Sequence, residues 1–474
     1  MTILWTDKTA AQATGGTCEG AWEASRVEID SRKVVKGDLF VALKGENFDG
    51  HAYAASALEK GAVAAVVSHV PEGVNAAQLL VVSDTQKALE DLGRAGRKRS
   101  QAKVVGVTGS VGKTSAKEML RLALSAHGET YATNGNYNNH IGTPLNLANL
   151  PPSAQFAVFE MGMNHAGEIA HLTKMVKPDV AVITNVEAVH LEFFDSLERI
   201  ADAKAEIFES MEKGGVAVLN ADNVFGNYLK QKAEMYGLQV LMCGRASDTD
   251  GQLLGYEPEA SGCMVRTRIG DENIAYPLQV TGAHWAQLFV MVLTAVKSLG
   301  LQADPSARKI MFEFKEPEGR GRQVPIVIDH KEILIVDDSY NASPASMKAA
   351  IAKTAGLGEK RSPIGRKFAV LGDMLELGAK SAEFHVELAG DLQRHGFDKV
   401  FTAGALMQLL YDALPETMRG AHMPQAVDLL PVLRKELQSH DILLIKGSHG
   451  SKMYELVKAL KNMTQGTGEQ RHAV

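Results

Sequence analysis

Val104-Val-Gly-Val-Thr-Gly-Ser-Val-Gly-Lys-Thr114 runs from an apolar segment into a glycine-rich turn. Such a turn points successive backbone N–H groups at one spot and forms a nest for phosphate oxygens. Lys113 adds a positive charge for the outer phosphates, and Thr114 adds a hydroxyl for Mg²⁺. A helix expected over residues 113–127 directs the positive end of its dipole to the same place. The sequence therefore predicts a phosphate-binding loop made of Thr108, Gly109, Ser110, Val111, Gly112, Lys113 and Thr114.

This loop is a short variant of its type. Val107 stands where the longer pattern has its first glycine. The alternative is a strand-to-helix turn that binds nothing, but the lysine, the threonine and the flanking strand and helix all favour phosphate binding.

Composition and charge restrict the class of protein. The chain has 474 residues, 45% of them hydrophobic, and a net charge of −6, which fits about three globular domains and argues against a general nucleic-acid binder. Cys18, Cys243 and Cys263 have neither metal-ligand spacing nor the number for a disulfide framework. The first residues do not resemble a signal peptide, and the longest apolar run, near residues 288–296, is too short to span a membrane. We therefore expect a cytoplasmic protein.

The order of apolar and polar segments predicts an α/β fold. We expect domains over residues 1–101, 102–302 and 303–463, followed by a polar tail over 464–474. Apolar runs without alternation, each followed by a helix, indicate a parallel sheet buried on both faces. The expected strands are residues 38–43, 62–68, 103–108, 155–160, 180–186, 215–220, 333–337, 367–372, 399–403 and 441–446. The expected helices are residues 52–60, 113–127, 197–211, 344–353 and 382–395.

Polar residues follow several of these strands. Glu160 ends one strand and His190 follows the next, so both are expected near the phosphate loop, where a carboxylate suits Mg²⁺. The alternatives are a solvated glutamate and a structural histidine. Lys204 lies in an expected helix, and its residue type alone favours a surface position.

Other loops have the composition of polar binding sites. The run Thr133-Asn-Gly-Asn-Tyr-Asn-Asn-His-Ile-Gly-Thr-Pro144 is rich in amide donors and acceptors, although an ordinary turn is the alternative. Asp30-Ser-Arg32 and residues 43–51 pair a cation with small polar residues, as phosphate or sugar sites do, or are two hairpin turns. In the last third, Asp338 precedes a helix that it could cap, and Arg320 lies in a flexible turn that could be a domain joint.

Together these motifs resemble the Mur ligase family, over residues 31–452. The resemblance rests on the order of the phosphate loop and of five further runs: Asp30-Ser-Arg32, Phe48-Asp-Gly-His51, Gly135-Asn-Tyr-Asn-Asn-His-Ile-Gly142, Asp337-Asp-Ser-Tyr-Asn-Ala342 and Gly372-Asp-Met-Leu-Glu-Leu-Gly378. It implies a three-domain architecture with a central, mostly parallel sheet that binds ATP and a Rossmann-like C-terminal domain. It also implies a monomer.

The resemblance implies an ATP-dependent ligase of peptidoglycan synthesis. ATP would phosphorylate the terminal carboxylate of UDP-N-acetylmuramoyl-tripeptide, and the amine of D-alanyl-D-alanine would attack the acyl phosphate to give the pentapeptide. Alternatives are a family member that adds a single amino acid, a folate polyglutamate ligase, and a nucleotide-binding switch without ligation. The third residue of the tripeptide, diaminopimelate or lysine, stays open.

The resemblance also implies roles for individual residues. Thr114 and Glu160 would bind the Mg²⁺ of ATP, Glu160 and His190 would bind a second Mg²⁺, and Lys204 would react with CO₂ to form a carbamate. Lys113, Lys204, Glu160 and His190 would be catalytic, while His284, Arg320 and Asp338 would contact the nucleotide. The substrate-binding residues would be Ser31, Arg32, Lys44, Phe48, Asp49, Gly50, His51, Thr133, Asn138, Asn139, Tyr340, Asn341 and Lys446.

The chain departs from the family pattern in two places. In Gly282-Ala-His-Trp-Ala-Gln-Leu288, the two asparagines of the family are replaced by Trp285 and Leu288. Trp285 would then either stack on adenine or belong to the core. His449 stands where the family usually has arginine.

Overall fold

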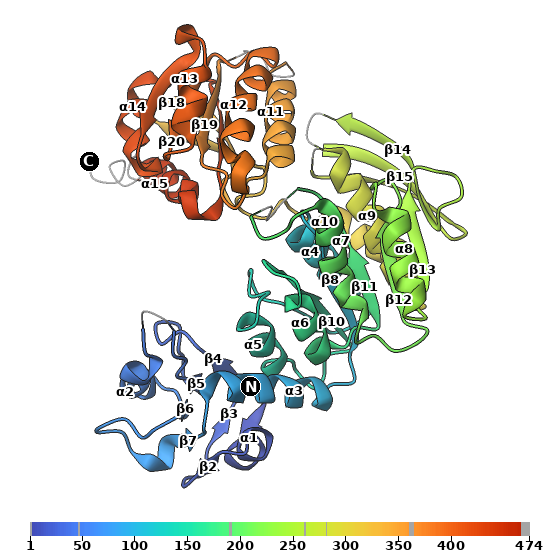
Figure 1. Cartoon of the computed structure of the whole chain (residues 1–474), viewed down its shortest axis with the longest axis vertical. Helices are drawn as coiled ribbons and strands as arrows, with labels where there is room; N and C mark the ends of the chain where they lie inside the picture. Colours follow the sequence, from blue (N-terminus) through green and yellow to red (C-terminus); the bar gives the residue numbers. More distant parts are fainter. Residues whose placement is uncertain are drawn as a thin grey trace, which may run out of the picture.

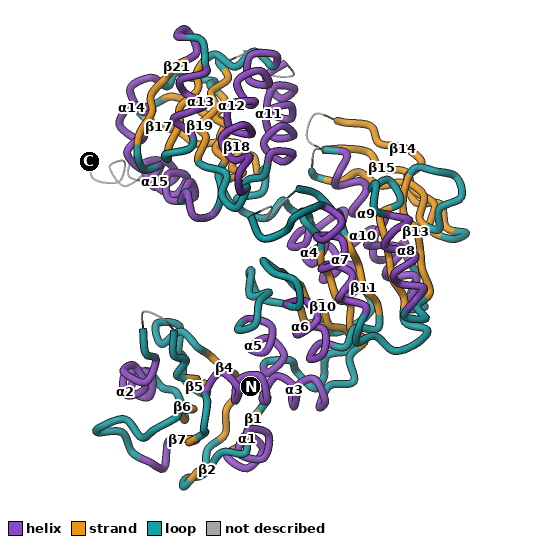
Figure 2. Tube along the Cα trace, in the orientation of Figure 1, coloured by secondary structure: helices purple, strands orange, loops and turns teal. Residues whose placement is uncertain are grey.

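The structure is a computed structural model that describes residues 2–45, 48–188, 192–259, 262–280, 282–359 and 365–465. Three units follow one another along the chain, and the central unit lies between the other two (Figure 1). Each unit is built on one main sheet with helices packed against it, and the N-terminal unit has a second, two-stranded sheet (Figure 2).

The N-terminal unit contains a five-stranded sheet in the order β2-β7-β6-β5-β4. Along the fully buried β5, Leu39 and Val41 belong to the apolar cluster that includes α3, whereas Phe40 belongs to the cluster that includes α2. The expected strands and helix of this region are present, the helix preceded by a 3₁₀ turn over Gly50–Tyr53. Its elements are β1 (Trp5–Thr6), α1 (Asp7–Thr14), β2 (Thr17–Cys18), β3 (Glu23–Ala24), β4 (Arg26–Glu28), β5 (Asp38–Val41), α2 (Ala54–Glu59), β6 (Ala64–Val67), β7 (Leu79–Val81) and α3 (Thr85–Arg99).

The central unit contains a nine-stranded sheet in the order β16-β15-β14-β13-β12-β11-β8-β10-β9. The strands from β9 to β14 in this order pair in parallel, as the sequence predicts. Its elements are β8 (Lys103–Thr108), α4 (Lys113–Ser125), β9 (Thr130–Ala132), α5 (Gly142–Ala148), β10 (Phe156–Glu160), α6 (Glu168–Val176), β11 (Val180–Ile183), α7 (Leu197–Ala205), β12 (Val216–Asn220), α8 (Gly226–Met235), β13 (Gln239–Gly244), β14 (Gly251–Glu259), β15 (Gly262–Ile269), β16 (Glu272–Leu278), α9 (Ala283–Ser298) and α10 (Ala303–Glu313).

Two features of the central unit differ from the sequence-based expectation. An antiparallel extension, β14-β15-β16, continues the parallel sheet. Helix α10 begins at Ala303, yet its apolar residues belong to the same core cluster as α4 and α9, and Ser306 Oγ donates a hydrogen bond to Ala123 O at 2.9 Å. The central core therefore continues beyond residue 302, where the sequence suggests that the next domain starts.

The expected buried helix is α9. Its residues from Leu288 to Val296 are all buried, so it is the apolar layer on one face of the sheet. In the part of the chain that the structure describes, no helix is long and apolar enough to cross a membrane.

The C-terminal unit contains a six-stranded sheet in the order β17-β18-β22-β19-β20-β21. Only the pairing of β17 with β18 is antiparallel among the strands described here, and the four expected strands are all present. Its elements are β17 (Arg322–Ile328), β18 (Lys331–Asp338), α11 (Pro344–Glu359), β19 (Lys367–Gly372), α12 (Ser381–Arg394), β20 (Lys399–Ala403), α13 (Met407–Ala413), β21 (Arg419–Met423), α14 (Leu430–Glu436), β22 (Ile442–Lys446) and α15 (Met453–Gln465).

The sheet order of the central unit determines where a ligand can bind. Strand β8 lies between β10 and β11: the chain passes from β8 to β9 and β10 on one side of it and then crosses to β11 on its other side. In such sheets the crevice outside the carboxyl ends of the strands, where the order reverses, is the usual ligand site. The glycine-rich loop after β8 and Glu160 at the end of β10 both lie at this edge.

Candidate active site

A cavity of about 740 Å³ lies between the central and C-terminal units. Its walls come from the glycine-rich loop, the ends of neighbouring strands, α9 and the first half of α11. Many of the residues that the sequence singles out line it together: Ser110, Val111, Gly112, Lys113, Asn138, Glu160, His284, Arg320, Asp338, Tyr340, Asn341 and Lys446.

The glycine-rich loop is held by the end of β11. Gly109 and Gly112 have φ angles of 149° and 84°, and a Cβ on Gly109 would come within 2.0 Å of Thr184 Oγ1, so that position requires glycine. Ser110 N donates a hydrogen bond to Asn185 O at 2.8 Å, and Thr184 Oγ1 donates one to Val111 O at 2.5 Å. The loop is therefore preformed against the end of β11.

Lys113 closes the loop from inside. Its Nζ donates hydrogen bonds to Gly109 O at 2.7 Å and Ser110 O at 3.4 Å. Burial lowers the pKa of Lys113, the carboxylate of Glu160 opposes this shift, and the guanidinium of Arg320 adds to it. The three side chains thus act electrostatically on one another across the cavity.

Glu160 carries an unpaired carboxylate oxygen. The residue is 1% exposed, and Asn138 Nδ2 donates a hydrogen bond to its Oε1 at 2.7 Å, whereas its Oε2 has no hydrogen-bond partner among the described residues. A buried anionic oxygen needs a compensating cation, and oxygen is the ligand atom that Mg²⁺ prefers. This position therefore fits a magnesium ligand.

The rest of the predicted metal site is less complete. Within the described ranges, no group of three histidine, cysteine, aspartate or glutamate side chains is arranged to hold a metal ion. His190 lies outside the described residues, so the metal role of this histidine stays a prediction.

Lys204 is not a surface lysine, so the expectation from its residue type alone was wrong. It is 2% exposed on α7, because it belongs to the face of that helix that also buries Ile200, Ala201 and Ala203. Burial and the nearby charge of Lys113 hold the pKa of Lys204 well below its ordinary value. Lys204 is thus electrostatically coupled to the phosphate loop.

The C-terminal unit supplies a second group of charges. Arg320 Nη2 donates a hydrogen bond to Thr114 Oγ1 at 3.0 Å, and its guanidinium lies 4.1 Å from the ring centroid of Tyr340. Strand register places Asp338 opposite Lys446, and the two form an ion pair at 2.8 Å. The hydrogen bond from Arg320 to Thr114 connects the C-terminal unit to the start of α4.

Helix α9 forms the wall beside the loop. Trp285 is 2% exposed, and its ring centroid lies 5.4 Å from that of Phe314, so it is a core residue whose edge reaches the cavity. Gln287, which the sequence analysis did not single out, also lines the cavity; its Nε2 donates to Asn220 Oδ1 at 3.1 Å and to Cys243 O at 2.9 Å.

His284 faces the cavity in its neutral form. Burial lowers the pKa of His284 to about 4; the positive charge of Lys353 adds to this shift, and the negative charge of Asp338 opposes it. Because the unfolded chain binds this proton near pH 6.5 and the folded chain only near pH 4, stability should fall as the pH decreases through this window.

Urea unfolding between pH 4 and 8 measures this effect. The free energy of unfolding should fall less steeply toward acid pH for His284→Gln than for the wild type. Equal slopes would contradict the assignment.

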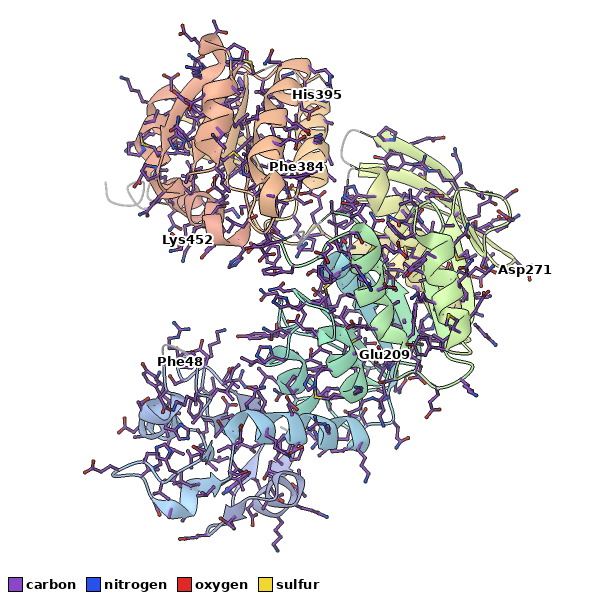
Figure 3. All side chains as sticks on the ribbon, viewed as in Figure 1. Phe48, Glu209, Asp271, Phe384, His395 and Lys452 are labelled. Carbon is purple, nitrogen blue, oxygen red and sulfur yellow. The ribbon has the colours of Figure 1, made fainter. Side chains whose placement is uncertain are left out.

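The predicted residues of the N-terminal unit form a separate surface. Arg32 donates to Asp30 at 2.9 Å, and this hydrogen bond lowers the pKa of Asp30 to about 2. Asp49 Oδ1 accepts hydrogen bonds from the backbone N–H of His51 at 2.9 Å and from its ring at 2.6 Å. Phe48 is 58% exposed. It lies on the side of the N-terminal unit that faces the C-terminal unit, and Lys452 lies on the facing side of the C-terminal unit (Figure 3).

The other predicted residues of this surface are Ser31, Lys44 and Gly50. They lie in the same turns, and none of them lines the cavity between the central and C-terminal units. A Cβ on Gly50 would lie 2.6 Å from Leu43 O, so this tight turn requires glycine.

Two residues of the asparagine-rich loop have structural hydrogen bonds instead of a place in the cavity wall. Thr133 is buried; its hydroxyl donates to Val158 O at 3.2 Å and accepts from Glu160 N at 3.1 Å. Asn139 Oδ1 accepts from Gly142 N at 2.9 Å, at the start of α5. Contact of Thr133 and Asn139 with a substrate stays a prediction.

Lys117 is a further buried residue that the sequence motifs did not indicate. This lysine on α4 is 1% exposed, and its Nζ donates to Thr133 O at 2.9 Å. The available signal was its position in the apolar stripe of the helix, beside Ala116 and Leu120, where a charge needs an internal partner.

Known protein families match this chain over most of its length. Residues 23–98 match the model of the Mur ligase family catalytic domain, residues 107–296 the Mur ligase middle domain, and residues 321–449 the Mur ligase glutamate ligase domain. The chain is 34% identical over 456 residues to a UDP-N-acetylmuramoyl-tripeptide–D-alanyl-D-alanine ligase of Rickettsia prowazekii, covering 96% of this chain and 99% of the relative. It is 35% identical to the ligase with the same name of Escherichia coli, covering 92% and 93%.

Solved structures agree with the sequence relatives. A crystal structure of MurF from Acinetobacter baumannii has a TM-score of 0.83 and 30% identity, with 97% of this chain and 99% of that chain covered. MurF from Thermotoga maritima, in complex with ADP, has a TM-score of 0.75 and 28% identity, with 94% and 98% covered. The family models, the sequence relatives and the solved structures all agree with the sheets and the phosphate loop of this chain. The chain therefore belongs to the Mur ligase family.

Proposed function

We propose that the chain is an ATP-dependent ligase that joins D-alanyl-D-alanine to UDP-N-acetylmuramoyl-tripeptide and so makes the UDP-linked pentapeptide of peptidoglycan synthesis. The observation that carries the proposal is a cavity that combines a preformed phosphate loop with Lys113 and a buried oxygen of Glu160 that has no partner among the described residues. The full-length similarity to ligases with this name supports the choice of substrates.

The proposed reaction has two steps. A carboxylate oxygen of the tripeptide attacks the γ-phosphorus of ATP, and ADP leaves. The dipeptide amine then attacks the carbonyl carbon of the acyl phosphate; a C–N bond forms, the C–O bond to phosphate breaks, and the amine loses a proton. Because the phosphates and the substrate carboxylate repel one another, the cations that converge on the cavity, Lys113 and Arg320, would stabilise both ground state and transition state.

The shape of the cavity supports one orientation of ATP. The phosphates would lie on the loop, and the base would lie between His284 and Leu288 on α9 and small side chains on α11, Ala345 and Ala349 among them. Asp338 would contact the ribose, and Arg320 the phosphates. The similarity to MurF of Thermotoga maritima in complex with ADP supports the use of this nucleotide.

Glu160 and Thr114 fit a Mg²⁺ ion that accompanies ATP. Glu160 would contribute its unpaired Oε2, and Thr114 its hydroxyl, which in the structure accepts a hydrogen bond from Arg320. The ion would supply charge neutralisation for the phosphates. A second Mg²⁺ held by Glu160 and His190 is a further part of the proposal.

Lys204 is proposed to carry a carbamate. Only a neutral amine attacks CO₂, and the lowered pKa of Lys204 makes that form available, while Lys113 would stabilise the anionic product. Turnover should therefore fall at least about 10-fold in CO₂-depleted buffer and return with bicarbonate. Lys204→Met should be equally slow with and without bicarbonate. Lys98→Met, which removes an exposed lysine of α3, should respond like the wild type.

The remaining parts of the substrates are assigned to the outer units. Ser31, Arg32, Lys44 and the turn from Phe48 to His51 would hold the uridine diphosphate. Asn138 and Asn139 would lie beside the muramoyl peptide, and Tyr340, Asn341 and Lys446 beside the dipeptide. We further propose three domains, with the second joint after Phe314 because α10 packs on the central core, and a monomer in the bacterial cytoplasm.

Product analysis tests the proposed function. ADP release should require ATP, Mg²⁺, a UDP-N-acetylmuramoyl-tripeptide and D-alanyl-D-alanine together, and the mass of the product should equal that of both substrates minus water. Diaminopimelate- and lysine-containing tripeptides, tested in parallel, decide the third residue. A product formed only with single amino acids would favour another family member. ADP release that ignores the carboxylate and amine substrates would favour a nucleotide switch.

A further inference from the structure

Lys117 is a buried charge that the proposed chemistry does not use. It lies on α4, one helical turn beyond Lys113, and is 1% exposed. A buried ammonium group is tolerated only where its hydrogens meet acceptors and its charge meets an opposite one. The surroundings of Lys117 therefore indicate what it does.

All three N–H donors of Lys117 have acceptors. Its Nζ donates to Thr133 O at 2.9 Å and to Gly135 O at 2.9 Å, and it forms an ion pair with Glu118 at 3.1 Å. An ammonium group has three donors and no acceptor, so none is left for a phosphate. Lys117 is thus directed away from the nucleotide and toward the asparagine-rich loop.

The asparagine-rich loop forms two hydrogen bonds with Glu160. The hydroxyl of Thr133 accepts a hydrogen bond from Glu160 N at 3.1 Å, and Asn138 Nδ2 donates to Glu160 Oε1 at 2.7 Å. The backbone of Asn138 also accepts a hydrogen bond from Gly162 N at 2.9 Å. A shift of the loop would therefore move the carboxylate of Glu160.

We propose that Lys117 is a positioning residue that fastens the asparagine-rich loop to α4, so that Lys113 on the helix and Glu160 under the loop keep their relative positions. This inference rests on the proposed ligase function for its effect on turnover. Its direct consequence, the anchoring of the loop, does not depend on the substrates. Because α4 also carries Thr114, the same helix would couple the nucleotide side of the cavity to the side where the muramoyl peptide is proposed to bind.

Lys117→Met tests the proposal, because it keeps the length and apolar stem of the side chain and removes the ammonium group. Amide hydrogen exchange over residues 133–139 should become at least about 10-fold faster than in the wild type. With a misplaced loop, kcat should fall about 100-fold and KM for the UDP-peptide should rise. The Kd for ATP should stay within about 3-fold of the wild-type value, because the phosphate loop is held by β11.

Control variants separate anchoring from general damage. Lys174→Met, at an exposed position of α6, should match the wild type in exchange rate, kcat, KM and the Kd for ATP. If Lys117→Met does not fold, Lys117→Gln, which keeps two uncharged amide N–H donors, is judged by the same criteria. Unchanged amide exchange over residues 133–139 in Lys117→Met would overturn the proposal. A loss of ATP affinity as large as the loss of kcat would also overturn it. If the wild-type protein forms no product, the proposed ligase function is wrong. The comparison of amide exchange between wild type and Lys117→Met still tests whether Lys117 anchors the loop.

Discussion

Lys113→Met should lower the rate of ADP release by at least about 10³-fold, equivalent to about 4 kcal/mol of transition-state stabilisation. Lys113 is the positive group inside the phosphate loop, where burial removes water that would otherwise screen its charge. Its hydrogen bonds to Gly109 O and Ser110 O also hold the loop closed. Initial rates of ADP formation with both substrates present measure the effect directly.

Lys113→Arg is the matched variant, because it keeps the charge and changes the shape. A guanidinium is planar and bulkier than an ammonium group, and the Nζ of Lys113 lies only 2.7 Å from Gly109 O, so the arginine should not fit this loop and activity should stay low. Full activity of Lys113→Met would contradict the nucleotide site. Thermal unfolding of both variants without nucleotide distinguishes a lost charge from a lost fold.

Buried parallel strands were the most predictable part of the fold. The expected strand over residues 103–108 and those over 367–372 and 399–403 agree with β8, β19 and β20 at both ends. These strands are covered on both faces, so their sequences are short apolar runs with clear limits. The extension β14-β15-β16 escaped prediction because its strands are partly exposed and alternate in burial, which weakens the apolar signal.

The site was predictable where the backbone alone determines position. Glu160 and the glycine-rich loop meet because adjacent parallel strands end at the same edge of the sheet. Burial of a charged side chain depends on tertiary partners, and a single helix does not reveal them. Lys204 therefore has a surface-type sequence but an interior position, and for Lys117 the apolar stripe of α4 indicates burial but not the partners of its charge. The same limit applies to Arg320, whose contact with Thr114 joins residues far apart in the chain.

Glu160→Gln should reduce turnover by about 10³-fold and raise the Mg²⁺ concentration needed for half-maximal activity. The substitution preserves the size of the side chain and its hydrogen bond from Asn138 through the retained carbonyl oxygen. It replaces the unpaired Oε2 by an amide NH₂, which repels a cation instead of binding it. The loss should therefore reflect the charge and the metal ligand, not packing. Initial rates at several Mg²⁺ concentrations measure both parts of the expected change.

Glu160→Asp and Glu168→Gln complete the comparison. The aspartate keeps the charge but withdraws it by one methylene group, so part of the activity should return at high Mg²⁺ concentration. Glu168 is an exposed carboxylate at the start of α6, and its replacement should leave the Mg²⁺ dependence unchanged. If Glu160→Gln retained the Mg²⁺ dependence of the wild type, the unpaired oxygen would not be a metal ligand. The cation that balances this buried carboxylate would then have to be Lys113, the ammonium group that already acts on it across the cavity.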